Sequence, residues 1–391
     1  MFLQFFIWGA WAVTLGTYLG TTLQFEGAQI GLIYGTTAIA AIISPLFVGF
    51  IADRHFESQH VFSVMHFAGA VLLFAASQVT DFVGLYALLL AYALCYMPTL
   101  ALANGVGFRN LTDPDREFPL VRVLGTIGWI VAGLVVGFLK LEDQNVPLQI
   151  AAGVSVLLGI YGYFLPRTPP KNTGKAQSIG QMLGFDAFSL LRDRAFLVLF
   201  VCSILISISL AFYYNFTNLF LNELGLENAA GKMTMGQASE VGFMLLMPLL
   251  VRRMGVKWMI AVGMLAWAVR YVLFAFGDVD PATVWMLYAG IVLHGICYDF
   301  FFVAGQIFAN QRAPQSLKNS VQGIMTLGTY GVGMFIGSLV SGWIVSGFTA
   351  ADGVKAWGSI WLIPASMAFV VLIAFVLLFN EERKVEAIDS E

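Results

Sequence analysis

Residues 195–221 read AFLVLFVCSILISISLAFYYNFTNLFL and contain no charged side chain. About 20 consecutive apolar residues are enough for an α-helix to cross the hydrocarbon core of a bilayer. The run is too long and too continuously apolar for a strand of a membrane β-barrel, which has about ten residues of alternating polarity. This stretch therefore predicts a membrane-spanning helix.

Eleven further stretches are also long and predominantly apolar. The twelve together cover residues 2–23, 28–52, 61–79, 82–106, 118–139, 147–165, 195–221, 234–251, 257–276, 282–308, 318–346 and 357–379. The composition agrees, because 59% of the 391 residues are hydrophobic and 11% are charged, against about 25% charged in soluble proteins. We expect an all-α membrane protein with twelve transmembrane helices, the first of them retained and not cleaved as a signal peptide. A soluble enzyme is excluded.

The longest connection lies between the sixth and seventh stretches and begins with a polar, proline-stiffened segment, residues 167–171. Two six-helix halves joined in this way are typical of transporters built from parallel repeats, with the solute site between the halves. Within the connection, residues 179–191 fit either a helix along the membrane surface or an ordinary amphipathic linker helix. The expected units are an N-terminal bundle at 1–165, a linker at 166–194, a C-terminal bundle at 195–380 and a tail at 381–391.

The basic residues predict the orientation, since Lys and Arg are enriched on the cytoplasmic side. Of the 20 Lys and Arg residues, 15 fall on the side that carries both termini and the linker. Three lie on the opposite side, at Lys140, Lys232 and Lys355, and two lie within helices. We therefore expect both termini in the cytoplasm.

Two loops in equivalent positions of the halves carry related motifs. After the second stretch stand Gly49, Asp53 and Arg54, and after the eighth stands Arg252-Arg253-Met-Gly-Val-Lys257. They resemble the front and the back of the loop signature G-x-x-x-D-R-x-G-x-[RK] of the major facilitator superfamily. We expect Gly49, Asp53 and Arg54 to act in conformational change; a basic turn of the kind found in any membrane protein is the alternative.

Few ionisable residues lie within the predicted helices, where a charge costs about 2.5–3.5 kcal/mol on insertion scales. They are His66, Arg122, Glu240, Arg270, His294 and Asp299. Each is a candidate for function, and the alternative is that acids and arginines form buried pairs that only hold helices together. The sequence indicates no role for His66 or Arg270.

Arg122, Thr126 and Trp129 follow one another at positions i, i+4 and i+7, on one face of the fifth helix. A guanidinium, a hydroxyl and a large ring on one stripe can hold a flat polar solute by hydrogen bonding and stacking. We therefore expect these three residues to bind substrate.

Three further helices carry polar side chains at helical spacing. Gln237 and Glu240 lie at i, i+3 on the eighth helix, and His294 and Tyr298 lie at i, i+4 on the tenth, followed by Asp299. An amide beside a carboxylate suits sugar hydroxyls, which need an acceptor as well as a donor. On the seventh helix, the pair Asn215 and Asn218 is expected either to bind substrate or to join helices.

The chain contains no G-x-S-x-G, H-E-x-x-H or G-x-x-x-x-G-K motif and no cysteine–histidine pattern of a metal site. We therefore expect no enzyme activity, no cofactor and no metal. The formal net charge of −3 gives no reason to expect a nucleic-acid partner. With no machinery for nucleotide hydrolysis, transport would use an ion gradient, and the acids within the helices point to protons.

Several segments resemble the bacterial nucleoside:proton symporters of the major facilitator superfamily. They are residues 3–11, 96–100, 118–128, 237–240 and 298–301, and they include the motifs R-x-x-G-T-x-G and Q-x-S-E. The resemblance implies a monomeric transporter that imports nucleosides with protons across the bacterial inner membrane by alternating access.

The resemblance also implies roles for individual residues. Arg122, Thr126, Trp129, Gln237, Glu240, His294 and Tyr298 would line the nucleoside site. Asp299, with Glu240, would couple transport to protons. Two alternatives stay open: a proton-coupled transporter of another small polar solute such as a sugar, and a membrane sensor that binds a solute without moving it.

Overall fold

The computed structural model describes residues 1–47, 56–169, 180, 185–314 and 317–380. Its longer elements are helices, among which η3 is a 3₁₀-helix and η1, η4 and η6 are π-helical. In chain order they are α1 (Phe2–Ala12), α2 (Leu15–Thr17), η1 (Tyr18–Thr22), α3 (Gly27–Phe47), α4 (Ser58–Ala76), α5 (Phe82–Asn110), α6 (Pro114–Phe138), α7 (Val146–Gly162), η3 (Phe185–Arg192), α9 (Arg194–Glu223), α10 (Ala229–Phe276), α11 (Val284–Val292), α12 (His294–Tyr298), η4 (Asp299–Val303), α13 (Ala304–Arg312), α14 (Lys318–Thr326), η6 (Leu327–Gly333), α15 (Met334–Gly347) and α16 (Trp357–Leu378).

The predicted all-helical membrane fold is confirmed. Within the described residues, ten helices are long and apolar enough to cross a membrane, and α7 is a shorter apolar helix. The first part of α10 completes twelve crossings, because Gly255 interrupts α10 with a φ of 73° and a ψ of 164°. That left-handed conformation favours glycine, and it divides α10 where the sequence predicts a loop.

The predicted helix boundaries need three corrections. The eighth crossing begins at Ala229 and not at residue 234, because the side chain of Asn228 accepts a hydrogen bond from the Gly231 N–H and caps the helix. The tenth crossing is interrupted at Leu293, between α11 and α12. In the linker, a 3₁₀-helix at Phe185–Arg192 stands where residues 179–191 were expected to form a longer helix; residues 179 and 181–184 lie outside the described part.

The charge-free stretch of α9 begins at a capped residue. The Asp193 carboxylate accepts hydrogen bonds from the backbone N–H groups of Ala195 and Phe196, which satisfies donors that a helix start leaves free. The same carboxylate forms an ion pair with Arg312 of α13 at 3.1 Å. The start of α9 is therefore tied to the end of the tenth crossing.

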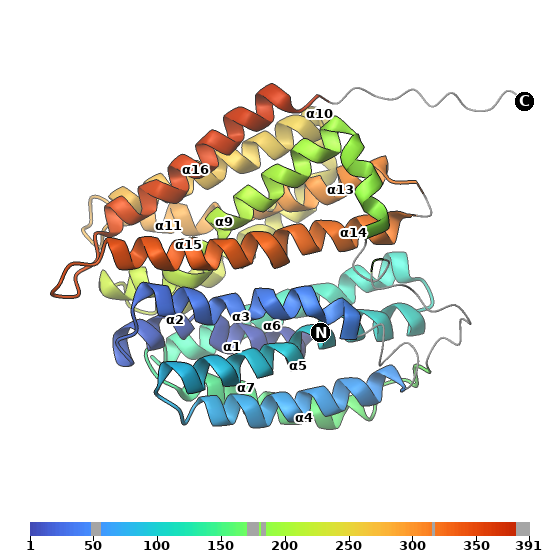
Figure 1. Cartoon of the computed structure of the whole chain (residues 1–391), viewed down its shortest axis with the longest axis horizontal. Coiled ribbons are helices and arrows are strands. Elements are labelled where there is room, and N and C mark those ends of the chain that lie inside the picture. The colour runs from blue at the N-terminus through green and yellow to red at the C-terminus, as the bar shows by residue number, and fades with distance from the viewer. Residues whose placement is uncertain (48–55, 170–179, 181–184, 315–316, 381–391) are drawn as a thin grey trace, which may run out of the picture.

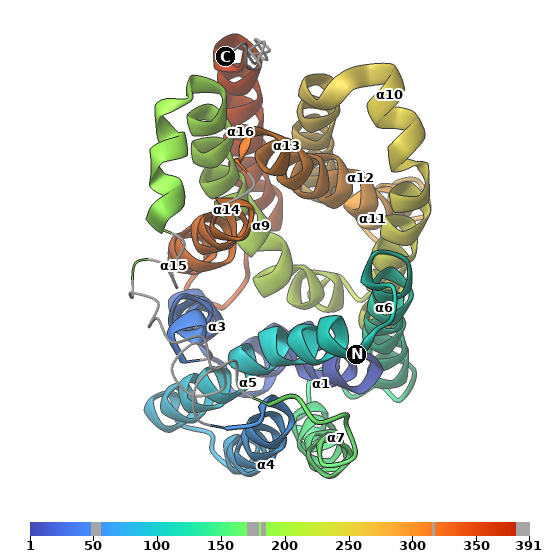
Figure 2. The same cartoon turned by 90° about the vertical axis from the view of Figure 1, so that its right-hand side faces the viewer.

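Two groups of helices lie side by side. Figures 1 and 2 show α1 to α7 on one side and α9 to α16 on the other. The groups meet along α3 and α15, α6 and α10, and α2 and α9. Glycines allow this close approach: a methyl group on Gly27 would lie 2.8 Å from the Ser346 nitrogen, and one on Gly133 would lie 2.8 Å from the Thr234 side chain.

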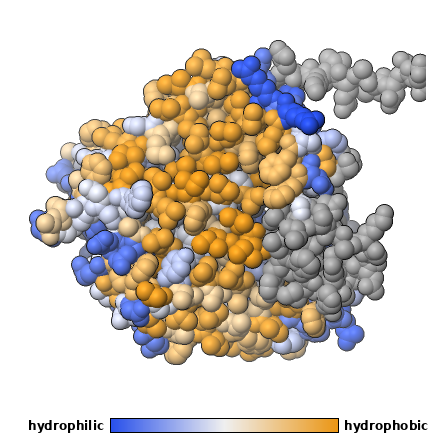
Figure 3. Space-filling view, in the orientation of Figure 1, coloured by the Kyte–Doolittle hydropathy of each residue, from blue (hydrophilic) through white to orange (hydrophobic). Residues whose placement is uncertain are grey.

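The outer surface is apolar, as lipid contact requires. Figure 3 shows hydrophobic residues over most of one face, with hydrophilic residues gathered toward its two ends. Large exposed side chains include Phe138, Leu245, Trp343 and Leu377, each at least 76% exposed. Contiguous exposed apolar surface of this kind marks a membrane-facing region.

Candidate functional site

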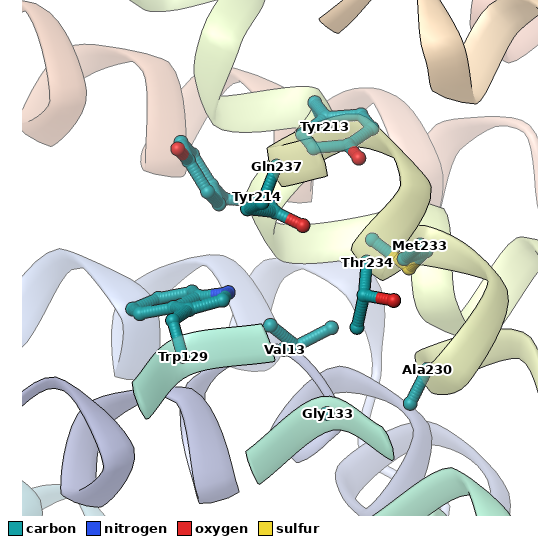
Figure 4. A pocket seen from close by; sticks show the side chains of 9 residues that line it. All are labelled: Val13, Trp129, Gly133, Tyr213, Tyr214, Ala230, Met233, Thr234 and Gln237. Atoms are coloured by element: carbon teal, nitrogen blue, oxygen red, sulfur yellow. The ribbon is translucent and has the colours of Figure 1, made fainter. Parts of the chain in front are cut away.

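A cleft lies where α6 of the first group faces α9 and α10 of the second. Its lining consists of Val13, Trp129, Gly133, Tyr213, Tyr214, Ala230, Met233, Thr234 and Gln237. Figure 4 shows the Trp129 indole on one wall, with Tyr214 and Gln237 on the facing wall. The cleft thus presents aromatic surface from both groups together with an amide and a hydroxyl.

Helix α1 supports the predicted stripe of α6. The Trp129 indole packs edge-to-face on Trp8, with ring centroids 5.6 Å apart. The Arg122 guanidinium lies over the Phe5 ring at 4.3 Å, an arrangement in which the ring face attracts the cation. Thr126, between them on the same face, is partly buried. The stripe therefore lies against α1 with its guanidinium and its indole both held by aromatic contacts.

Ser239 joins α10 to the break in the tenth crossing. Its hydroxyl lies 2.7 Å from the carbonyl oxygen of Val292 and accepts a hydrogen bond from the Gly295 N–H at 3.0 Å. A methyl group on Gly295 would lie 2.6 Å from the Glu240 nitrogen, so the two backbones touch. This contact brings two predicted site residues together, with His294 Nε2 at 4.0 Å from Glu240 Oε2.

Glu240 interacts with the other charged residues that the sequence predicts for the site. Its side chain is 18% exposed, and its carboxyl interacts electrostatically with Arg122 of the first group and with Asp299 of η4. Glu240 therefore interacts with each of the predicted residues Arg122, His294 and Asp299.

Asp299 is a buried acid near Glu240. It is fully buried, and neither carboxyl oxygen has a hydrogen-bond partner among the described residues. It begins the π-helical segment η4, a type of distortion that is frequent at functional sites. The preceding residue, Tyr298, shares a hydrogen bond with the hydroxyl of Tyr330 in η6.

Sequence reasoning missed three residues that line the cleft, Tyr213, Tyr214 and Thr234, and it missed Tyr330, which contacts Tyr298. The polar and aromatic cluster around residues 213–218 was visible in the sequence, but nothing in it separated the two tyrosines from the asparagines that follow. Thr234 follows Lys232 near the start of α10, and Tyr330 lies in a glycine-rich stretch; neither side chain carries a charge that would single it out in the sequence.

The two asparagines of α9 lie away from the cleft lining. Asn215 donates to the hydroxyls of Ser338 and Ser341 in α15, at 3.2 and 3.3 Å. Asn218 accepts a hydrogen bond from Thr17 of α2 and donates to Glu142 in the turn between α6 and α7. Both amides therefore join helices in this structure.

Glu142 is the centre of a polar contact between the two groups, which we name the Glu142 cluster: Thr17, Glu142, Asn218, Asn222 and Ala230. The buried carboxylate accepts hydrogen bonds from the side chains of Asn218 and Asn222, both at 2.8 Å. It also accepts one from the Ala230 N–H at the start of α10, at 3.1 Å, where the helix dipole favours a negative charge. The cluster holds the groups together at the end of the bundle that carries the α6–α7 turn.

The other predicted residues lie elsewhere. His66 is buried in the first group, where its Nε2 lies 2.8 Å from the side-chain oxygen of Gln4, and the Gln4 amide donates to Thr99. This contact joins α4, α1 and α5, away from the cleft. The loop residues Gly49, Asp53 and Arg54 lie outside the described residues.

Comparisons with known proteins agree with this architecture. The family described as nucleoside H⁺ symporter matches residues 1–384. The chain is 44% identical to the putative nucleoside transporter YegT of Escherichia coli strain K12, over 97% of this chain and 92% of the relative. It is 35% identical to the xanthosine permease of the same strain, over 99% and 96% of the two chains.

Solved structures of transporters have the same fold as this chain. The crystal structure of the nucleoside transporter NupG superposes with a TM-score of 0.89 at 33% identity, covering 97% of each chain. The POT family transporter PepTSo, at 14% identity and a TM-score of 0.71, shares the fold alone. The chain belongs to the nucleoside H⁺ symporter family and has the major facilitator superfamily fold.

Proposed function

We propose that the chain imports nucleosides together with protons, by alternating access at the cleft between its two groups of helices. The observation that carries this proposal is the chemistry of the cleft walls. Aromatic rings come from both groups, and hydrogen-bonding side chains lie beside them. A nucleoside combines a flat base with a polyhydroxyl sugar and needs both kinds of surface.

The base would stack on Trp129, whose ring is already held by Trp8, and pack against Tyr214 on the facing wall. Base–aromatic stacking contributes about 1–3 kcal/mol per base. This contact tolerates different bases, because every base presents a π-face. The proposed site is therefore selective for nucleosides as a class.

The polar groups of the nucleoside would meet Arg122, Gln237 and Glu240, with Thr126 on the α6 face. Arg122 only donates, a carboxylate accepts, and an amide does both. Since Arg122 and Glu240 come from opposite groups, a solute bound to both bridges them. His294, whose Nε2 lies 4.0 Å from Glu240 Oε2, and Tyr298 complete the proposed site.

A proton on Glu240 or Asp299 would lower the cost of changing conformation. A buried carboxylate without a counter-ion is expensive, and Asp299 has no partner among the described residues. Binding a proton makes the group neutral before the cleft closes around it. One proton moved across a potential of 100 mV supplies about 2.3 kcal/mol, which supports roughly fiftyfold accumulation of the solute.

We further propose that residues 1–165 and 195–380 move as two bundles about the linker at 166–194, in a monomer. The asymmetry of basic residues, 15 on one side and three on the other, supports an orientation with both termini in the cytoplasm. The relatives from E. coli support the bacterial inner membrane as the location.

The test is uptake by the purified chain in proteoliposomes, with the interior alkaline and labelled uridine outside. We expect accumulation that adenosine and other nucleosides compete away and that collapses with a protonophore. Trp129→Ala should weaken uridine binding roughly 5- to 150-fold. The matched control is Trp343→Ala, because that indole is 76% exposed on the outer surface.

Two outcomes would contradict the proposal. Uptake competed away by a sugar but not by any nucleoside would assign another solute to the cleft. Nucleoside binding without accumulation under any pH gradient would instead indicate a membrane sensor.

A further inference from the structure

Arg270 is a buried cation that the proposed binding site does not use. It lies in the second part of α10 with no exposed surface, and it forms no ion pair among the residues that the structure describes. Its guanidinium lies 3.4 Å from the centroid of the Tyr213 ring and within 5.7 Å of the rings of Trp267 and Phe274. Burying a charge without a counter-ion is costly, and aromatic faces offset only part of that cost.

Within the described residues, this guanidinium donates a hydrogen bond to His294. Arg270 Nη1 lies 3.1 Å from His294 Nδ1, while Arg270 Nε and Nη2 have no partner in the described structure. A guanidinium can only donate hydrogen bonds. His294 Nδ1 must therefore carry a lone pair, and the proton of the neutral ring must reside on Nε2.

The ring of His294 is also fixed in orientation. It stacks on Tyr213, with centroids 5.1 Å apart and planes 20° apart, and meets Tyr214 edge-on. Its Nε2 has no hydrogen-bond partner among the residues that the structure describes, and it lies 4.0 Å from Glu240 Oε2. A small movement of the Glu240 side chain would bring this pair to hydrogen-bond distance.

We propose that Arg270 is a positioning residue for proton coupling: through His294 Nδ1 it holds the Nε2–H donor toward Glu240. The ionised carboxylate can accept this hydrogen bond, so the donor favours the form of Glu240 that has released its proton. Arg270 would thus act on Glu240 without touching the solute. This inference rests on the proposed role of Glu240 in proton coupling.

The other groups around Glu240 come from several elements. They are Arg122 of α6, Tyr213 and Tyr214 of α9, His294 and Tyr298 of α12, Asp299 of η4 and Tyr330 of η6. Of these, His294 is bonded to Arg270. Replacing Arg270 should therefore change proton coupling through His294 and leave the Arg122 side of the cleft in place.

The first test is nitrogen NMR of the wild-type chain labelled at histidine. The chain has four histidines, so His294→Gln assigns the signal. We expect the Nε2–H tautomer in the wild type. An Nδ1–H tautomer or a doubly protonated ring at neutral pH would overturn the proposal, and this readout requires neither a folded Arg270 variant nor any nucleoside.

The second test compares Arg270→Met and Arg270→Lys in proteoliposomes. In Arg270→Met we expect gradient-driven nucleoside accumulation to fall at least tenfold, nucleoside exchange without a gradient to stay within threefold of wild type, and the pH profile of uptake to shift. Arg270→Lys, which keeps a donor and a charge, should restore part of the accumulation. The control is Lys232→Met, which removes a cation lying over the Tyr288 ring and should behave as wild type.

An equal loss of exchange and accumulation in Arg270→Met, with a monodisperse protein, would mean that Arg270 supports the binding site only and would overturn its coupling role. If the wild type moves no nucleoside at all, the proposed function fails, while the tautomer result still decides the geometry around His294.

Discussion

Replacing Glu142 by Gln should shift the chain away from the conformation in which the Glu142 cluster is closed. The Glu142 carboxylate accepts hydrogen bonds from Asn218, from Asn222 and from the N–H of Ala230 at the start of α10. The Ala230 N–H donates to both carboxylate oxygens, at 3.1 and 3.2 Å, and both asparagines donate to Oε2. A Gln oxygen in the place of Oε2 can keep the contacts to that atom, but the NH₂ group in the place of Oε1 would face the Ala230 N–H, donor against donor. The variant therefore loses at least one hydrogen bond to a charged acceptor.

A hydrogen bond to a charged group contributes about 1.5–3 kcal/mol. Each 1.4 kcal/mol is a factor of ten in an equilibrium constant, so the ratio of closed to open molecules should fall roughly 10- to 150-fold. Since the contact joins the two groups of helices, this change should appear in the distance between them and leave the packing within each group unchanged.

The assay is electron–electron double resonance between spin labels at Gln144→Cys and Asp352→Cys. Both residues are exposed, Gln144 in the α6–α7 turn and Asp352 in the α15–α16 turn, and the native cysteines are first replaced. We expect Glu142→Gln to add a longer-distance population.

The control is Asp143→Asn, because the Asp143 side chain is exposed and the residue contacts Thr22 through its backbone carbonyl. If Glu142→Gln and Asp143→Asn give the same distance distribution, the cluster does not stabilise the closed conformation and the reasoning is wrong.

Three further predictions follow from contacts described above. Asp299→Asn removes the isolated buried acid and should abolish gradient-driven accumulation of nucleosides while exchange persists; wild-type accumulation would exclude Asp299 from proton coupling. Ser239→Ala removes the contacts with Val292 and Gly295 and should weaken uridine binding about 5- to 30-fold in calorimetry, at about 1–2 kcal/mol for the lost hydrogen bonds; unchanged affinity would show that the helices keep their positions without it. Gly31→Leu places a side chain against Ser338 and Gly342 of α15, so the spin-label distance should lengthen as in Glu142→Gln, and an unchanged distance would contradict the importance of this backbone contact.

Hydropathy predicted the membrane helices, and spacing singled out Trp129 and Gln237, which line the cleft. Arg122, Glu240, His294 and Asp299 stand out because a charge within an apolar stretch needs a reason, and the structure brings these four together. Because only 11% of the residues are charged, the few charged side chains within the predicted helices are easy to identify.

The parts that sequence could not predict depend on partners far away in the chain. Asn218 looks the same from sequence whether it binds a solute or Glu142, which lies 76 positions earlier in a polar turn. The break at Leu293 follows no proline, and its polar groups are satisfied by Ser239 from another helix. The role of Arg270 likewise depends on which nitrogen of His294 it meets.

The π-helical segment η4 has a consequence for insertions and deletions. A π turn holds about one residue more than an α turn, and each residue of an α-helix rotates the chain by about 100°. Removing one residue within Phe300–Val303 could therefore be absorbed by converting η4 into ordinary α-helix, with α13 still facing the same neighbours. A single deletion within α9, which contains neither a proline nor a π-helical segment, offers no such adjustment and would turn the remainder of that helix toward different surroundings.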